Sequence, residues 1–134
     1  MASKNQKIAL GTVQFGLDYG ISNNTGKTSS EEVSKILDTA CSYGIDILDT
    51  AQAYGDSESI IGSHHGNRFK IITKINPTSG DKRLAKQLVE QSLQRLYLDK
   101  LYGVLFHNAI SAIQNPRIVA ELKELQEQGI IEKV

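Results

Sequence analysis

Short apolar segments alternate with longer amphipathic stretches along this chain. Runs rich in β-branched and aromatic residues predict strands, whereas apolar residues at every third or fourth position predict helices. By these patterns we expect strands at residues 8–13, 45–50, 69–75, 101–106 and 130–134, and helices at residues 29–43, 57–62, 81–96 and 115–128. Four strand-and-helix units are therefore followed by a fifth strand, which is only beginning where the sequence ends.

Residues that cap helices support several of these boundaries. Ser29-Ser30-Glu31-Glu32 is a capping-box pattern, and Gly44 is a typical residue to end the same helix. Asp81 is expected to begin the third helix. Asn115 followed by Pro116 combines a cap with a proline at the first helical position, which predicts the start of the fourth helix.

Each predicted strand is apolar through nearly its whole length, which is typical of parallel strands that helices cover. The chain has 134 residues, the length of one domain, and shows no internal linker or low-complexity segment. An open doubly wound sheet and half of a β/α barrel both fit this alternation. The pattern alone does not choose between these two architectures.

Composition narrows the function classes. The 15 basic and 15 acidic side chains cancel, so nothing draws the whole protein towards nucleic acid or an anionic membrane. No apolar run is long enough to cross a bilayer, and Met1–Lys7 is not followed by a signal-peptide hydrophobic region. Cys41 is the only cysteine, which fits a reducing compartment, and its place on the apolar side of a helix predicts a buried structural thiol. We therefore expect a soluble cytoplasmic protein with neither nucleic acid nor membrane as partner.

Four polar residues lie at or just beyond the carboxyl ends of three predicted strands. Asp49 and Tyr54 follow the second strand, Lys74 is near the end of the third, and His107 follows the fourth. Because the carboxyl ends of parallel strands converge on one face, we expect these four side chains to form a site. Each alone has an ordinary structural explanation, and their coincidence favours function.

The four residue types suit the protonation of an alkoxide. A phenol is a poor acid near neutral pH, since its reference pKa is about 10. An ammonium beside it favours the phenolate, and a carboxylate paired with the ammonium holds that charge in place. A histidine could donate a hydrogen bond to a carbonyl oxygen as negative charge develops there. The combination of Asp49, Tyr54, Lys74 and His107 therefore predicts carbonyl reduction.

Other sequence signals are weaker. The glycines at residues 11, 16 and 20 indicate a loop where backbone approaches a ligand, but they do not form a dinucleotide-fold fingerprint. His64 and His65 are adjacent, so they do not share one helix or strand face, and no matching carboxylate or cysteine spacing accompanies them. We expect no metal site.

Four segments, taken in order, are similar to the motifs of one known family. They are Leu10-Gly11-Thr12-Val13-Gln14-Phe15-Gly16, Leu48-Asp49-Thr50-Ala51 through Ala53-Tyr54-Gly55, Ile72-Thr73-Lys74, and Leu105-Phe106-His107-Asn108. They resemble the first strand and loop, the catalytic Asp and Tyr motif, the catalytic-lysine strand and the catalytic-histidine strand of the aldo/keto reductases. Ser57–Gly62 is similar to the segment that follows the tyrosine in that family.

This resemblance implies a function and a cofactor. The catalytic tetrad would be Asp49, Tyr54, Lys74 and His107, with Tyr54 as general acid and nicotinamide C4 as hydride donor. The implied cofactor is NADPH, or less often NADH. Residues near the nicotinamide ribose would be Gly11, Thr12, Val13 and Asp49. The implied reaction reduces an aldehyde, ketone or sugar carbonyl to the alcohol.

The resemblance also implies a parallel (β/α)8 TIM barrel. A complete barrel takes about 250 residues. Residues 1–134 carry the first four β/α units and the start of strand 5, so we interpret them as the N-terminal half of such a barrel, truncated before the main cofactor-binding segments. A half-barrel exposes two strand edges and its interior side chains, which predicts self-association.

Two other functions stay open on the residues alone. One is a catalytically inactive half-barrel that acts as a self-associating or binding module. The other is a Schiff-base lyase with Lys74 as nucleophile, because barrel enzymes place lysines at strand ends. The second gives no joint role to Asp49 and Tyr54.

Overall fold

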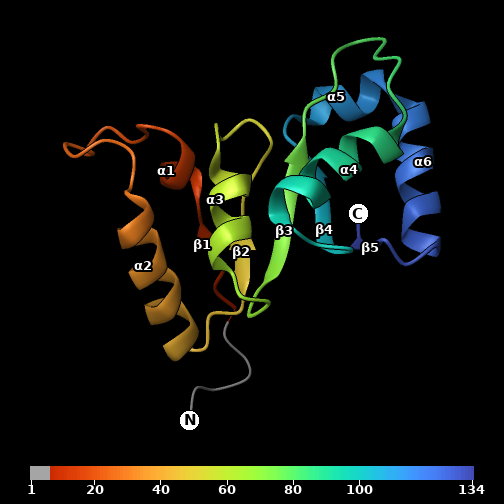
Figure 1. Cartoon of the computed structure of the whole chain (residues 1–134). Helices are drawn as coiled ribbons and strands as arrows, with labels where there is room; N and C mark the ends of the chain where they lie inside the picture. Colours follow the sequence, from red (N-terminus) through yellow and green to blue (C-terminus); the bar gives the residue numbers. More distant parts are fainter. Residues whose placement is uncertain (1–6) are drawn as a thin grey trace.

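The computed structural model describes residues 7–134 and contains one five-stranded parallel sheet (Figure 1). The strands are β1 Leu10–Gly11, β2 Ile47–Asp49, β3 Lys70–Ile75, β4 Leu101–Phe106 and β5 Ile131–Lys133. The helices are α1 Val13–Gly16, α2 Ser30–Ser42, α3 Ser57–His64, α4 Ala85–Leu96, α5 Ala109–Gln114 and α6 Pro116–Glu127.

The order of the strands in space decides between the two architectures that the sequence left open. It is β1-β2-β3-β4-β5, so every strand pairs with its neighbours in sequence. A doubly wound sheet reverses its strand order at a switch point, and this sheet has no reversal. Figure 1 shows α2, α3, α4 and α6 following one another across the sheet in chain order, as the outer helices of a β/α barrel do.

One apolar core lies between the sheet and these helices. Alternate residues of the strands point into it, because successive side chains of a strand face opposite sides of the sheet. The strands contribute Leu48, Ile71, Ile75 and Val104, and the helices contribute Val33, Leu37, Ile61, Leu88, Ile118 and Leu122, all at most 2% exposed. The helical spacing of Val33 and Leu37, and of Ile118 and Leu122, explains why these segments fold as helices against this core.

Strand register brings the carboxyl ends of the strands to one edge. Asp49 pairs with Ile72, and Ile72 pairs with Gly103. Two residues further along, Lys74 pairs with Leu105. The ends of β2, β3 and β4 are therefore level with one another, as the predicted site requires.

The predicted elements are present, with shifted boundaries and two additions. The strand expected at 8–13 is β1, which ends at Gly11, because one turn of helix, α1, begins at Val13. The strand expected at 130–134 is β5, Ile131–Lys133. The short helix α5, Ala109–Gln114, was not predicted, and it buries none of its residues against the core.

The prediction that the third helix begins at Asp81 was wrong, since α4 begins at Ala85. The Asp81 carboxylate accepts the backbone N–H of Arg83 at 2.9 Å and pairs with its guanidinium at 2.6 Å, which holds a local turn instead. The backbone N–H of Ala85 donates to the Glu121 carboxylate of α6 at 2.6 Å. A residue distant in sequence therefore supplies a partner for the start of α4.

The prediction of a buried Cys41 was also wrong, since this residue is exposed. The buried face of α2 is formed by Val33, Leu37 and Ala40. A helix turns by about 100° per residue, so the position after Ala40 lies to the side of that face.

The segment Met1–Gln6, on which part of the signal-peptide argument rested, lies outside the described residues. Within residues 7–134, no helix has the length and apolar character needed to cross a membrane.

Candidate active site

The four polar residues predicted at the strand ends lie together in the structure. Asp49 is the last residue of β2, Tyr54 lies in the turn between β2 and α3, Lys74 is in β3, and His107 follows β4 directly. The backbone N–H of His107 donates to the carbonyl of Ile75 at 2.8 Å, which continues the ladder between β3 and β4 by one residue. Parallel pairing therefore places all four side chains on one edge of the sheet.

The Lys74 ammonium is the centre of this cluster. Its Nζ atom is 2.5 Å from Asp49 Oδ1, donates to the carbonyl oxygen of Thr50 at 2.9 Å, and lies 3.4 Å from Tyr54 Oη. The Lys74 side chain is 16% exposed, and that of Asp49 is 34% exposed. A charge pair that is partly withdrawn from water interacts more strongly than one on the surface, so Asp49 fixes the ammonium beside the phenol.

His107 approaches the same tyrosine from another side. The rings of Tyr54 and His107 have centroids 5.9 Å apart and an interplanar angle of 81°, so they meet edge to face. The Lys74 Nζ atom lies 5.0 Å from the centre of the Tyr54 ring. Tyr54 is thus flanked by a cation and an imidazole, the two groups expected to assist proton donation by a phenol.

Two glycines set the position of the Tyr54 turn. A Cβ atom on Gly16 would lie 1.7 Å from the carbonyl oxygen of Tyr54, and one on Gly55 would lie 2.4 Å from the carbonyl oxygen of Gly16. Gly55 also has a positive φ of 57°, which glycine adopts at little cost. The end of α1 and the tyrosine turn therefore touch backbone to backbone, which no side chain at residue 16 would allow.

Sequence reasoning missed a buried hydroxyl cluster beneath the site. Ser57 Oγ lies 3.1 Å from Thr50 Oγ1 and 3.1 Å from Thr12 Oγ1. The Thr12 hydroxyl donates to the carbonyl of Asp49 at 2.9 Å. All three hydroxyl residues are at most 1% exposed. This cluster ties the ends of β1 and β2 to the start of α3, and its only sequence signal is that all three residues lie inside segments that resemble the family's motifs.

The three residues expected near a nicotinamide ribose differ in what they offer. A Cβ on Gly11 would meet nothing within 4 Å, so open space adjoins this residue. Thr12 is 1% exposed, and its hydroxyl is already bonded to Asp49 and Ser57. Val13 is half-buried at the start of α1. A ligand at this edge could reach Gly11, Val13 and Asp49, whereas Thr12 serves to hold them in place.

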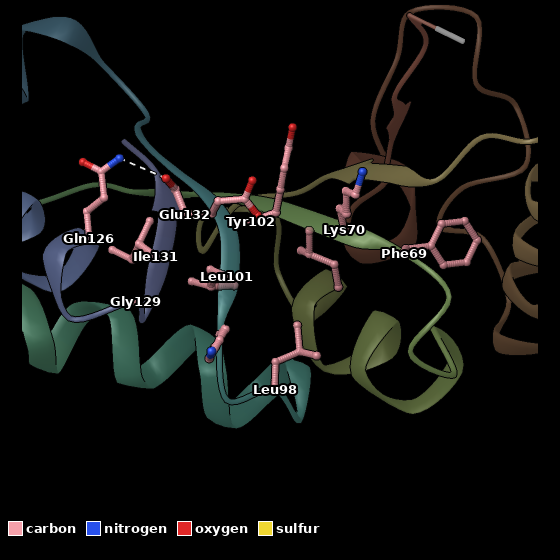
Figure 2. Close-up of a pocket in the computed structure, with 11 residues that line it drawn as sticks. Phe69, Lys70, Leu98, Leu101, Tyr102, Gln126, Gly129, Ile131 and Glu132 are labelled. Carbon is pink, nitrogen blue, oxygen red and sulfur yellow. Dashed lines mark hydrogen bonds between the residues drawn. The ribbon is translucent and has the colours of Figure 1, made fainter. Parts of the chain in front are cut away.

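A separate cavity of about 480 Å³ lies at the amino ends of β3, β4 and β5, away from the tetrad. In Figure 2, Lys70 and Tyr102 point to one side of the strands, and Leu98 and Leu101 point to the other. The Nζ atoms of Lys70 and Lys133 lie 5.5 Å and 5.0 Å from the centre of the Tyr102 ring. The pKa of Lys133 is raised, chiefly because of its hydrogen bond to the Tyr102 side chain.

The adjacent histidines have partners within the protein. His65 is buried, its Nδ1 accepts the backbone N–H of Asn67 at 2.8 Å, and its Nε2 therefore donates to the carbonyl of Leu96 at 2.8 Å. His64 Nε2 lies 2.7 Å from Ser30 Oγ. Across residues 7–134, no three His, Cys, Asp or Glu side chains gather in a way that could hold a metal ion.

Comparison with known proteins gives consistent relatives. The family model of the aldo/keto reductase family matches residues 7–134. An uncharacterized oxidoreductase of Bacillus subtilis, YqkF, is 28% identical over 142 residues, which cover 94% of this chain and 46% of that protein. A crystal structure assigned to the aldo-keto reductases, from Pseudomonas aeruginosa, is 32% identical with a TM-score of 0.76, over 92% of this chain and 52% of the other.

A more distant solved structure agrees on the fold. It is an aldo-keto reductase from Klebsiella pneumoniae in complex with NADPH, 23% identical, with a TM-score of 0.69 over 92% of this chain and 42% of that one. The chain thus spans about half the length of the relatives that it matches. Its five-stranded sheet corresponds to half of their β/α barrel, which confirms the predicted fold class. Because the family model covers nearly the whole sequence, the chain belongs to the aldo/keto reductase family.

Proposed function

We propose that, in a complete barrel, this site reduces an aldehyde, ketone or sugar carbonyl to the alcohol with NADPH, or with NADH, as hydride donor. One observation carries the proposal. The Lys74 ammonium lies between the Asp49 carboxylate, at 2.5 Å, and the Tyr54 hydroxyl, at 3.4 Å, while His107 meets the same phenol edge to face. This arrangement suits a phenol that gives up its proton.

Each side chain has a distinct role in this proposal. Tyr54 donates its proton to the carbonyl oxygen as that oxygen becomes an alkoxide. Lys74 stabilises the phenolate that remains, and Asp49 holds the ammonium in place. His107, which is exposed, donates a hydrogen bond to the same oxygen and orients the carbonyl.

The residues present fit a nicotinamide cofactor at this edge. Gly11 adjoins open space, and Asp49 keeps a third of its side chain exposed beyond its bond to Lys74. Gly11, Val13 and Asp49 would contact the ribose, with Thr12 fixing the backbone of Asp49. When bound, the cofactor supplies the hydride that adds to the carbonyl carbon.

The geometry favours a reductase over a Schiff-base lyase. An amine that attacks a carbonyl needs a free lone pair. Lys74 Nζ already contacts Asp49 Oδ1, the carbonyl oxygen of Thr50 and the Tyr54 hydroxyl, so three protein oxygens occupy positions around its nitrogen.

The first test is an NADPH titration of the 134-residue chain, followed by fluorescence or calorimetry. Saturable binding that Lys74→Met weakens would mean that the half-barrel, by pairing with itself, builds a usable nicotinamide site. Lys70→Met is the matched control, because Lys70 lies four residues earlier in β3 and pairs with Asp46, outside the site. Binding that neither substitution changes would contradict the proposed site. A folded chain that binds no NADPH would mean that this half has the four site residues but not the rest of the cofactor site, and that the activity belongs to the longer protein.

The second candidate is a catalytically inactive half-barrel that self-associates. Within residues 7–134, β1 and β5 each have a strand on only one side, and Leu105 is 44% exposed beside Lys74 in the register. Unpaired edges and exposed apolar side chains promote association. Sedimentation equilibrium should show a dimer or larger species, and a compact monomer at high concentration would exclude this candidate.

The proposal also includes the cellular context. A small-molecule carbonyl compound is the expected substrate, with no nucleic acid or membrane partner. A cytoplasmic location is supported by a sequence whose only cysteine, Cys41, is exposed and has no second cysteine to pair with.

A further inference from the structure

Glu58 is a buried carboxylate that the proposed reaction does not use. It lies in the first turn of α3, and its side chain is 2% exposed. Thr73 Oγ1 donates to Glu58 Oε1 at 2.6 Å, and Arg95 Nη1 lies 3.3 Å from Glu58 Oε2. Burying a carboxylate is costly unless its oxygens have partners, and here each oxygen has one. Both oxygens of Glu58 are therefore bonded, and one of the two bonds is made to β3.

The position of Glu58 closes a ring of contacts around the tyrosine and lysine. Glu58 follows Ser57, whose backbone N–H donates to the carbonyl of Tyr54 at 3.0 Å. Thr73 precedes Lys74, whose Nζ lies 3.4 Å from Tyr54 Oη. Three hydrogen bonds therefore complete the ring: Ser57 to Tyr54, Thr73 to Glu58, and Lys74 to Tyr54. The remaining links are between chain neighbours, Ser57 with Glu58 and Thr73 with Lys74.

Opposite faces of β3 take part in this ring. Successive side chains of a strand point to opposite sides, so Thr73 faces the helices while Lys74 faces the site. Thr73 is fully buried, whereas Lys74 is partly exposed. The bond between Thr73 and Glu58, on the helix side of the sheet, therefore fixes the position of Lys74 relative to the start of α3.

We propose that Glu58 is a positioning residue, which through Thr73 holds the Lys74 ammonium against Tyr54. The Lys74–Tyr54 separation of 3.4 Å is at the long end of hydrogen bonding, so a small slip of β3 breaks this contact. The consequence for catalysis rests on the proposed reductase function. The position of the ammonium does not depend on that function, and it can be measured without substrate or cofactor.

The readout is the exchange of the Lys74 ammonium protons with water, followed by ¹⁵N-edited NMR of the 134-residue chain. The signal is identified by its absence in Lys74→Met. Thr73→Val lacks the hydroxyl but keeps the branched shape. In this variant we expect proton exchange to be faster by about tenfold, which corresponds to the loss of one charge-assisted hydrogen bond. Thr73→Ser restores the hydroxyl and should restore slow exchange.

Arg95→Met is the control for general destabilisation. It removes the ion pair with Glu58 but leaves the bond to Thr73. We expect it to lower the melting temperature without changing Lys74 exchange. If Thr73→Val does not fold, Thr73→Ala is compared with Thr73→Ser in its place.

The proposal is overturned if a folded variant without the Thr73 hydroxyl keeps parental exchange, or if Arg95→Met accelerates exchange equally. Because neither result involves turnover, failure of this inference is separate from failure of the proposed function. If the chain proves active, Thr73→Val should lower kcat and leave KM unchanged, since the pair acts on the proton step.

Discussion

Replacement of Gly16 by alanine tests the backbone contact that positions Tyr54. The new Cβ would lie 1.7 Å from the carbonyl oxygen of Tyr54 and 2.7 Å from the amide nitrogen of Ser57. Ordinary van der Waals contact of a Cβ atom begins near 3.4 Å, so α1 and the tyrosine turn must separate by about 1.7 Å. Both neighbours are backbone atoms, so no rotamer change relieves the clash.

The expected cost follows from this displacement. Overpacking at a rigid site destabilises by about 1–3 kcal/mol, and a backbone clash belongs at the upper end. For a domain of this size we expect Gly16→Ala to lower the melting temperature by roughly 10 °C. A shift of about 1 Å in Tyr54 would also reduce any turnover by on the order of a hundredfold.

Thermal unfolding followed by circular dichroism measures this effect, with Gly11→Ala as the matched control. Neither glycine has a positive φ, and a Cβ on Gly11 would meet nothing within 4 Å. Both substitutions add one methyl group, but only the one at residue 16 meets backbone atoms. Equal melting temperatures for the two variants would refute the close packing of α1 on the tyrosine turn.

Three further results are expected. The pKa of Glu121 is lowered, first because the backbone N–H of Ala85 donates to its carboxylate and then because of Arg117. The ionised carboxylate therefore stabilises the fold above its ordinary pKa of 4.5, and this stability is lost as the pH falls through the lowered pKa. Glu121→Gln should cost about 1 kcal/mol of unfolding free energy at pH 7 in urea, and a difference from the parent that persists unchanged in strong acid would contradict this. The exposed Cys41 thiol should react fully with a chromogenic disulfide in the folded chain, whereas protection until unfolding would show that it is buried. Borohydride with an aldehyde should leave Lys74 unmodified by mass spectrometry, and a trapped adduct there would support the lyase instead.

The sequence was sufficient for features that depend on local pattern. The helix expected from Ser29 forms with that residue as N-cap, whose side chain accepts the backbone N–H of Glu32 at 3.2 Å. The strand expected at 101–106 is β4, with the same bounds. The convergence of the tetrad also followed, because parallel pairing alone brings strand ends to one edge. The chemical roles of the four residues stay predictions.

Features that depend on distant contacts were not predictable in this way. The start of α4 depends on Glu121, 36 residues beyond Ala85. The close approach of α1 to the tyrosine turn depends on Gly16 meeting Gly55, which the spacing of glycines in the sequence does not reveal. Cys41 was misplaced because one residue along a helix separates a buried position from an exposed one.

The sequential strand order has a consequence for how the protein is made. Because β2 pairs with β1, β3 with β2, and so on, each strand that leaves the ribosome finds its partner already synthesised. Every pairing joins strands that are consecutive in the sequence, with one or two helices between them, so ordering costs little chain entropy at each step. The sheet can therefore grow in one direction during translation, with the newest strand always forming the edge to which the next one adds.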